Sequence, residues 1–600
     1  MSKKSPQNIN FAQIRNACLD NGLNVFVCER PAVPLVSVQL WVRTGSIHEQ
    51  EYLGCGLSHF LEHMLFQGCD GYPGQAAADV VNRLGGEFNA YTSFGCTVYY
   101  IDLPSRHLTE ATKILSAMIS TPEFPEEKFL SEKEVILRER DMVRDNPSRL
   151  LGEKLWQNVF TTHPVRHPII GYRDLIKSVN RNMMAAYYER RYSPLRSFFV
   201  ISGDVRTDEV FKTVEDHLGS WRLGRADEPS LPQEPPKAAP HYSEFSFPDP
   251  LSRLAIGYRS PAATHRDTPA LDILSGILGM NRSSRLVSRF RIRESLALQV
   301  GAVNYAPYFC GMFGITAAAM PEHMTELEVG IFEELNRICD SGVTVEEVER
   351  ERLQQSTEYL RLLNTASGIA RVTGDSILSC GSPEYPEIYL KLLESVTPDT
   401  IREAAIKYLR PETVTVVRMQ PEDAKGKSVH IPSPVLNGNL NMIEGDGSRF
   451  VMLPDKQLPL IDLCAILPGG TILESSENAG ITRLTANLLC AGCGNMSEEK
   501  FNQELDDNAI DLHITGGANT LLVRMNCRRD RFRQAAGLFC KILSAPAFSE
   551  REFERERANT IEALKSRALA PQSAAEDLMI KALFGDHPYS LPRSGTEQAM

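Results

Sequence analysis

Two histidines and a glutamate stand close together in the segment HFLEH, as His59, Glu62 and His63. On a helix, side chains four positions apart lie on one face, with Cβ atoms about 5–6 Å apart, so both imidazoles can reach one metal ion. Glu62 projects beside such an ion, where it can take a proton from metal-bound water. Imidazole nitrogen suits Zn²⁺, and a catalytic zinc site keeps three protein ligands and an open water position. The segment therefore predicts one Zn²⁺ per chain and a third ligand from elsewhere.

The order HxxEH inverts the HExxH signature of zinc proteases. A chance match is improbable in 600 residues with 13 histidines, but the motif alone does not exclude it. A third ligand can come from the segment SEKEVILRERDMV, which offers Glu132, Glu134 and Glu139. Glu132 and Glu139 are two helical turns apart, about 10 Å along one face, so both cannot bind the same ion.

An internal repeat helps to choose between these glutamates. GLSHFLEHMLFQG begins at Gly56 and GITRLTANLLCAG at Gly480, an offset of 480 − 56 = 424 that holds without a gap over about a hundred residues. The copy loses the four positions that a zinc site needs: His59 becomes Arg483, Glu62 becomes Ala486, His63 becomes Asn487 and Glu139 becomes Ala563. Glu132 survives as Glu556. We therefore take Glu139 as the ligand and Glu132 as a carboxylate that orients it or a histidine. The alternative for Glu132 is a solvated helix face.

The elements around these residues alternate irregularly. Residues 23–47 are typical of two strands broken at Pro31 and Pro34, and residues 54–66 then take helical spacing. EFNAYTSFGCTVYYIDLP indicates a strand pair, and amphipathic helices are predicted at about 107–120 and 125–145. Paired strands of this kind favour an α+β fold over a doubly wound sheet.

Two segments rich in proline and charge, 223–242 and 419–447, are typical of exposed connections between domains. We expect a zinc-bearing catalytic domain at 1–228 and a second homologous α+β domain at 243–420. A linker at 421–447 would lead to a third domain at 448–600, a degenerate copy of the first that lacks its last part. Doubling the offset suggests about 850 residues in all, with the final stretch absent here.

Composition narrows the function classes. The chain has 64 Lys and Arg against 76 Asp and Glu, and its net charge of −12 argues against a nucleic-acid binder. No run approaches the 18–20 apolar residues of a membrane span, and no secretory h-region follows the N-terminal lysines. Thirteen scattered cysteines suggest reduced thiols and a cytoplasmic location.

These motifs together resemble the pitrilysin/insulinase-type (inverzincin) zinc metallopeptidases. The resemblance rests on GLSHFLEHMLFQG, on GGEFNAYTS and on the helix carrying Glu132 and Glu139, and it covers nearly the whole chain. It implies repeated domains of antiparallel-rich sheet packed with helices, in a clamshell of two homologous halves around a chamber. It also implies that His59, His63 and Glu139 bind Zn²⁺, that Glu62 is the general base and that substrate adds as a strand at Asn89 and Ala90.

The expected function is a zinc-dependent endopeptidase for peptides or unfolded polypeptides, with no nucleic-acid or membrane partner and with homo-oligomers possible. The rival is a non-catalytic scaffold, like core subunits that resemble these peptidases without their zinc set. One departure concerns an Arg and a Tyr seven residues apart, which help to hold substrate in the family's inactive half. The second domain has Arg293 but Val300 at the Tyr position, so the working pair would lie in a fourth domain outside these residues.

Overall fold

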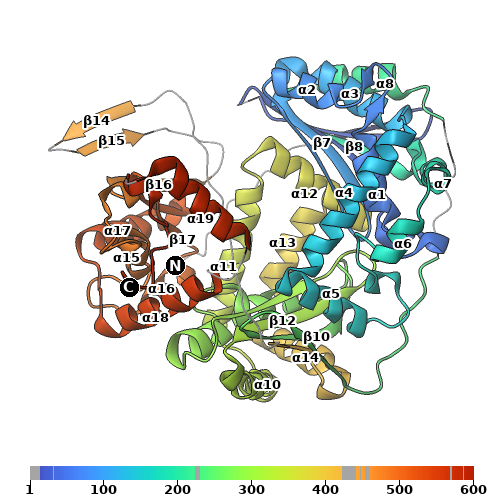
Figure 1. Cartoon of the computed structure of the whole chain (residues 1–600). Coiled ribbons are helices and arrows are strands. Elements are labelled where there is room, and N and C mark those ends of the chain that lie inside the picture. Colours follow the sequence, from blue (N-terminus) through green and yellow to red (C-terminus); the bar gives the residue numbers. More distant parts are fainter. Residues whose placement is uncertain are drawn as a thin grey trace, which may run out of the picture.

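Three sheets, one after another along the chain, organise the computed structural model (Figure 1). The structure describes residues 14–31, 33–222, 224, 230–421, 441–445, 448–452, 459–567, 571–585 and 587–600. Among these residues no helix combines the length and apolar character needed to cross a bilayer. All thirteen cysteines are free thiols.

The first sheet has six strands in the order β1-β2-β8-β3-β7-β6. Its strands are β1 (Arg15–Cys18), β2 (Asn24–Glu29), β3 (Leu35–Val42), β6 (Glu87–Thr92), β7 (Thr97–Pro104) and β8 (Ser197–Gly203). A small pair, β4 (Gly68–Cys69) and β5 (Tyr72–Pro73), lies apart from it. The helices are α1 (Leu57–Leu65), α2 (Ala76–Arg83), α3 (Leu108–Ser120), α4 (Glu126–Arg144), α5 (Pro147–Val159), α6 (Arg173–Ser178), α7 (Arg181–Arg191) and α8 (Thr207–Leu218).

Strand β3 is buried along almost its whole length because helices cover both faces of the sheet. Val38 and Leu40 join the core formed with Phe60 and Leu61 of α1. On the opposite face Trp41 packs against Ala370, which belongs to a helix from the second sheet's part of the chain. A central strand buried on both faces is mostly apolar, as residues 35–42 are apart from the buried Ser37 and Gln39.

The second sheet has the order β11-β12-β10-β13-β9. Its strands are β9 (His241–Phe247), β10 (Ser252–Ser260), β11 (Gln299–Tyr305), β12 (Gly311–Ala319) and β13 (Thr415–Pro421). Its helices are α9 (Thr268–Ser275), the π-helices η6 (Gly276–Met280) and η7 (Val287–Arg293), α10 (Met324–Ser341), α11 (Val345–Leu362), α12 (Ala366–Cys380), α13 (Tyr385–Ser395) and α14 (Pro398–Tyr408). Helix α12 packs on β3 and β8 of the first sheet, which joins these two parts of the molecule.

The third sheet repeats part of the first. Its elements are β16 (Leu460–Pro468), β17 (Asp511–Gly516) and β18 (Thr520–Arg528) with α15 (Ile481–Leu489), α16 (Glu498–Asp507), α17 (Phe532–Ser544), α18 (Glu550–Arg567) and α19 (Pro571–Phe584). In the first sheet Glu87 pairs with Asp102, and in the third sheet Asp511 pairs with Asn526. Each residue of the second pair stands 424 positions after its counterpart in the first. Helix α15 begins 424 residues after α1, at Ile481 and Leu57 respectively. The repeat seen in the residues is thus a repeat of structure.

Most of the linker predicted at 421–447 lies outside the described residues. Its last part is not an irregular connection, because β14 (Asn441–Gly445) pairs with β15 (Ser448–Met452) in a two-stranded antiparallel sheet. The other predicted connection, 223–242, is largely exposed where it is described. Two of its side chains are nevertheless anchored: Glu234 accepts a hydrogen bond from the His163 amide at 2.7 Å, and Lys237 donates to the Val414 carbonyl at 2.9 Å.

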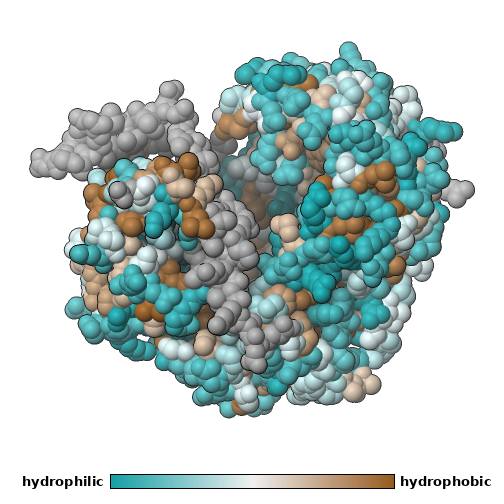
Figure 2. All heavy atoms as spheres, in the orientation of Figure 1, coloured by the Kyte–Doolittle hydropathy of each residue, from teal (hydrophilic) through white to brown (hydrophobic). Residues whose placement is uncertain are grey.

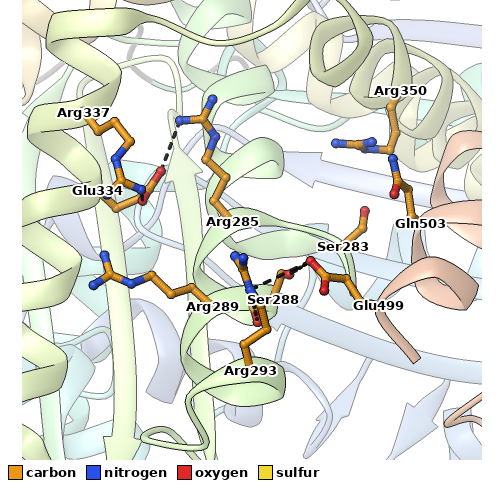
Figure 3. Close-up of a pocket in the computed structure, with 10 residues that line it drawn as sticks. All are labelled: Ser283, Arg285, Ser288, Arg289, Arg293, Glu334, Arg337, Arg350, Glu499 and Gln503. Carbon is orange, nitrogen blue, oxygen red and sulfur yellow. Dashed lines mark hydrogen bonds and ion pairs between the residues drawn. The ribbon is translucent and has the colours of Figure 1, made fainter. Parts of the chain in front are cut away.

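Charged contacts attach the third sheet's helices to the second part of the chain. The Ser283 amide donates to Asp506 at 2.6 Å and Arg350 donates to Asp507 at 2.8 Å. Beside these bonds lies a cavity of about 370 Å³, which Figure 3 shows to be lined largely by arginines. Arg285 is paired there with Glu334 and Glu347 inside the second part, and Arg293 pairs with Glu499 of α16 at 3.8 Å, across to the third sheet's helices.

Candidate metal centre

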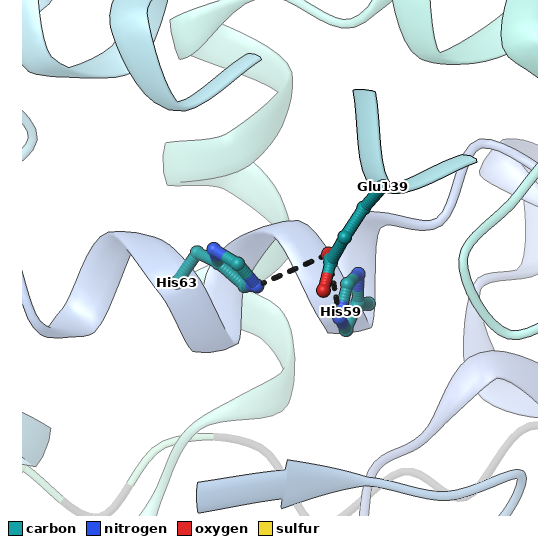
Figure 4. Close-up of side chains that lie close together, drawn as sticks. All are labelled: His59, His63 and Glu139. Carbon is teal, nitrogen blue, oxygen red and sulfur yellow. Dashed lines mark ion pairs between the residues drawn. The ribbon is translucent and has the colours of Figure 1, made fainter. Parts of the chain in front are cut away.

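The three side chains expected to bind zinc meet at one point. His59 and His63 project from one face of α1 and Glu139 reaches them from α4 (Figure 4). The Oε2 atom of Glu139 lies 3.7 Å from Nε2 of His59 and 3.6 Å from Nε2 of His63. One ligand atom from each residue lies within 4.8 Å of the others, and this is the one such cluster of metal-binding side chains in the described ranges.

The ligand atoms of these three side chains are arranged to bind a cation and not to hydrogen-bond with one another. Oε2 of Glu139 is buried and has no hydrogen-bond partner within the described parts of the chain. Burial, followed by the charge of His63, holds the pKa of His59 at about 3, so its imidazole is neutral, the form that binds metal. Two imidazoles and a carboxylate are a donor set that Zn²⁺ accepts. The residues present therefore fit a zinc ion.

Glu132 lies behind the site, on the same helix as Glu139. Its Oε2 atom is 3.3 Å from Nδ1 of His63, and its Oε1 accepts a hydrogen bond from Gln67 at 3.0 Å. This contact orients the His63 ring so that Nε2 faces Glu139. Glu132 is 16 % exposed, so the alternative of a solvated helix face does not describe it.

Glu62 is buried beside the two histidines. Its Oε2 accepts a hydrogen bond of 2.5 Å from the Thr92 hydroxyl, on β6. Burial raises the pKa of the Glu62 carboxyl, and the bond from Thr92 acts in the opposite direction. The carboxylate is thus held by a defined contact at the edge of the cluster.

Strand β6 carries Asn89 and Ala90 at the margin of the first sheet. It pairs with β7 on one side, and no described strand pairs with it on the other. The Asn89 side chain is exposed, and its Oδ1 accepts from the Ala90 amide at 2.8 Å. The geometry is that of an open sheet edge; its use by substrate stays a prediction.

Three contributors to the site did not emerge from the residues alone: Thr92, Gln67 and Glu49. Thr92 lies three residues after Asn89 in the quoted strand segment, and Gln67 stands four positions after His63, a spacing that could have indicated it. Glu49 accepts from the amides of Gly56 and Ser58 at 3.2 and 2.9 Å and so holds the first turn of α1. No spacing rule connects an irregular segment to the helix start that it anchors.

Comparison with known proteins agrees with the repeated fold. The family model described as insulinase (peptidase family M16) matches residues 25–173 and 464–597, and the M16 inactive-domain model matches 178–355. A protein of Rickettsia bellii named as an uncharacterized zinc protease is 30% identical over 401 residues, covering 66% of this chain and 96% of its own.

Solved structures extend this likeness to the fold. A protease from Helicobacter pylori has a TM-score of 0.65 and 24% identity, covering 68% of this chain and all of that one. The periplasmic protease PqqL of Escherichia coli, with a TM-score of 0.58 and 17% identity, covers 98% of this chain and 72% of its own. The fold and the clustered residues define a two-half, zinc-protease-like α+β protein. The chain belongs to the insulinase family of peptidases, M16.

Proposed function

We propose that the chain is a zinc-dependent endopeptidase that hydrolyses peptides or unfolded polypeptides. The observation that carries this proposal is the convergence of His59, His63 and Glu139, with an orphaned carboxylate oxygen between two imidazole nitrogens. The relatives named as zinc proteases add support. The second-domain match to an inactive-domain model concerns residues 178–355, outside this cluster.

In this mechanism His59, His63 and Glu139 would hold Zn²⁺, which supplies Lewis-acid chemistry to water and to the scissile carbonyl. Glu62 accepts the proton from the attacking water and returns it to the leaving amine, acting first as base and then as acid. The Thr92 hydroxyl fixes one oxygen of Glu62, which leaves the other oxygen for the proton. A peptide lying along β6 would place its backbone beside this carboxylate.

The test compares the native chain with Glu62→Gln, by measuring bound zinc and cleavage of a quenched fluorescent peptide. Glu62 is not one of the three clustered side chains that would hold the metal, so zinc content should stay the same. Cleavage should fall at least about a hundredfold because the proton acceptor is gone. Unchanged cleavage in the variant contradicts the proposal, and a native chain that takes up no zinc favours the rival scaffold function. A cytoplasmic location and homo-oligomer formation stay predictions.

A further inference from the structure

The second part of the chain has a cavity where the first part has its metal centre. The strand order β11-β12-β10-β13-β9 repeats β6-β7-β3-β8-β2, and in each sheet one pair is parallel, β13 with β9 and β8 with β2. Helix α9 lies between β10 and β11 in the chain as α1 lies between β3 and β6. The cavity measures about 430 Å³ and is lined from α9, β11, α11, α12 and α13.

Two carboxylates line this cavity. Asp272 of α9 accepts hydrogen bonds from the Asn304 amide at 2.7 Å and from the Tyr389 hydroxyl at 2.6 Å. Asp375 of α12 also lines the cavity; its side chain is exposed, and it forms no recorded hydrogen bond or ion pair with the described residues. Burial raises the pKa of the Asp272 carboxyl to about 6, and the hydrogen bonds from Tyr389 and Asn304 oppose the rise. The cavity is therefore an anionic recess that lacks a counter-ion in direct contact.

The rest of the lining is aromatic and apolar. Tyr389 lies between Tyr359 and Tyr385, with ring centroids 6.4 and 6.3 Å away. At the rim, Met280 and Val303 are 61% and 47% exposed. Aromatic faces attract cations, and apolar side chains pack against a hydrocarbon stem. A side chain with a cationic end group on a long apolar stem would place its charge beside the carboxylates and its stem against the apolar rim.

The cavity lies close to strand β6. Arg371, one helical turn before Asp375, places its guanidinium 5.8 Å from the ring centroid of Tyr91, which follows Ala90 on β6. Tyr305 follows Asn304 on β11. Burial and Cys96 raise the pKa of Tyr305, and the negative charge of Asp375 raises it further. The edges of β6 and β11 thus approach the same helix. A peptide that lies along β6 can extend towards the cavity.

We propose that this cavity binds an arginine or lysine side chain of the peptide substrate, between the carboxylates of Asp272 and Asp375 and the rings of Tyr359 and Tyr389. This inference rests on the proposed peptidase function and names part of its substrate class. A metal ion is the poorer occupant, because the residues described by the structure hold three-ligand geometry only at His59, His63 and Glu139. The net charge of −12 favours the approach of basic peptides.

The test measures binding rather than turnover, with the zinc-loaded Glu62→Gln chain as parent. The probes are a labelled neutral peptide with one arginine, moved one position at a time, and the same peptides with citrulline instead. In the best arginine position the arginine peptide should bind about tenfold more tightly than its citrulline partner, the gain expected of a charge-assisted contact. Adding Asp375→Asn should remove this difference and leave citrulline binding unchanged. Glu394→Gln, an exposed carboxylate of α13 outside the cavity, should preserve it.

Equal binding of arginine and citrulline peptides at every position would overturn the inference. So would a loss in Asp375→Asn that is the same for both peptides, because it would report altered packing and not charge recognition. The proposed function has a separate readout in the chain with Glu62 intact, which should cleave a peptide without basic residues that the Glu62→Gln chain leaves uncut. If no peptide is cleaved but the arginine preference is present, the peptidase proposal fails while the cavity assignment stands.

Discussion

At the scale of single residues, the centre depends on the spacing of its ligands and on the atoms behind them. The spacing of four puts the rings of His59 and His63 on one face of α1, with centroids 4.8 Å apart. Only one of the two rings is held from behind: Glu132 contacts Nδ1 of His63, whereas Nδ1 of His59 is buried without a hydrogen-bond partner in the described ranges. Of the two histidines proposed to bind zinc, His63 is therefore the pre-oriented one.

We expect Glu132→Gln to weaken zinc binding by about 10–100-fold, because the amide cannot fix the His63 ring as the carboxylate does. Competition against a chelating dye measures this affinity. The control is Glu134→Gln, an exposed neighbour on the same helix that should bind zinc as the native chain does. Equal affinities for the two variants would mean that Glu132 plays no part in positioning His63.

At the scale of elements, the start of α1 determines where its histidines point. Glu49 accepts from the amides of Gly56 and Ser58, and in the repeat Glu474 accepts from those of Gly480 and Thr482. A carboxylate at a helix N-terminus satisfies free amides and complements the helix dipole. Retention of this contact in the copy that lacks the proposed zinc ligands marks it as part of the fold and not of the chemistry.

Gly56 has a φ of +68°, and a Cβ there would lie 2.2 Å from the Ile170 carbonyl oxygen. Gly56→Ala should therefore destabilise the first domain by about 3 kcal/mol and weaken zinc binding, since α1 must shift. Gly152→Ala in α5 is the matched control, because nothing lies within 4 Å of its Cβ and it should stabilise by about 0.5–1 kcal/mol. Thermal unfolding with and without zinc measures both variants. A stable, zinc-binding Gly56→Ala would refute the fixed helix start.

The connection between the first and second sheets should respond to pH through Glu234. Burial acts to raise the pKa of this carboxyl, but hydrogen bonds from Thr161, Thr162 and His163 lower it to about 2 from 4.5. Because the pKa is depressed in the folded state, its contribution is complete above about 4.5 and is lost as the pH falls towards 2.

Glu234→Gln should accordingly lower stability by about 2 kcal/mol at pH 7, and by progressively less as the pH falls below about 4.5. Calorimetry of the first unfolding transition over this range gives the comparison. Glu209→Gln, with a side chain 63% exposed, should match the native chain throughout. A Glu234→Gln deficit that is the same at every pH would show that the ionised carboxylate is not its source.

At the scale of the whole molecule, the residues predicted local elements and the repeat far better than long-range contacts. Apolar periodicity predicted α1 with its buried Leu61 and Met64, and the offset of 424 predicted α15. Neither the periodicity nor the repeat could predict the hydrogen bond from Thr92 to Glu62, because the strand and the helix that carry them meet only in the folded chain. Asp272 and Asp375 are 103 positions apart (375 − 272), and no periodicity links them. The arrangement of the cavity is a product of tertiary packing.

The docking of the second sheet's helices on the first sheet is the contact that places the cavity beside β6. Trp41 of β3 lies against Gly374 of α12, where an added Cβ would come within 2.1 Å of the indole. The Gln39 side chain also donates to the Ser367 carbonyl at 3.1 Å, and Arg43 donates to that of Ile377 at 3.2 Å. Close packing of this kind cannot absorb a methyl group without moving one of the two elements.

Gly374→Ala should push α12 away from the sheet and raise hydrogen exchange in both α12 and β3, because their close packing leaves no room for the added methyl group. Zinc affinity should not change, since α1 and α4 lie wholly within the first domain, whereas binding of arginine peptides should weaken as Asp375 moves with its helix. Gly537→Ala in α17, where nothing lies within 4 Å of the Cβ, is the control for adding a helical alanine. Native hydrogen exchange in α12 together with unchanged peptide binding in Gly374→Ala would contradict the prediction, because it would show that the cavity does not depend on this contact between α12 and β3. Loss of zinc together with peptide binding would instead show that the first domain needs α12 to keep its own centre in order.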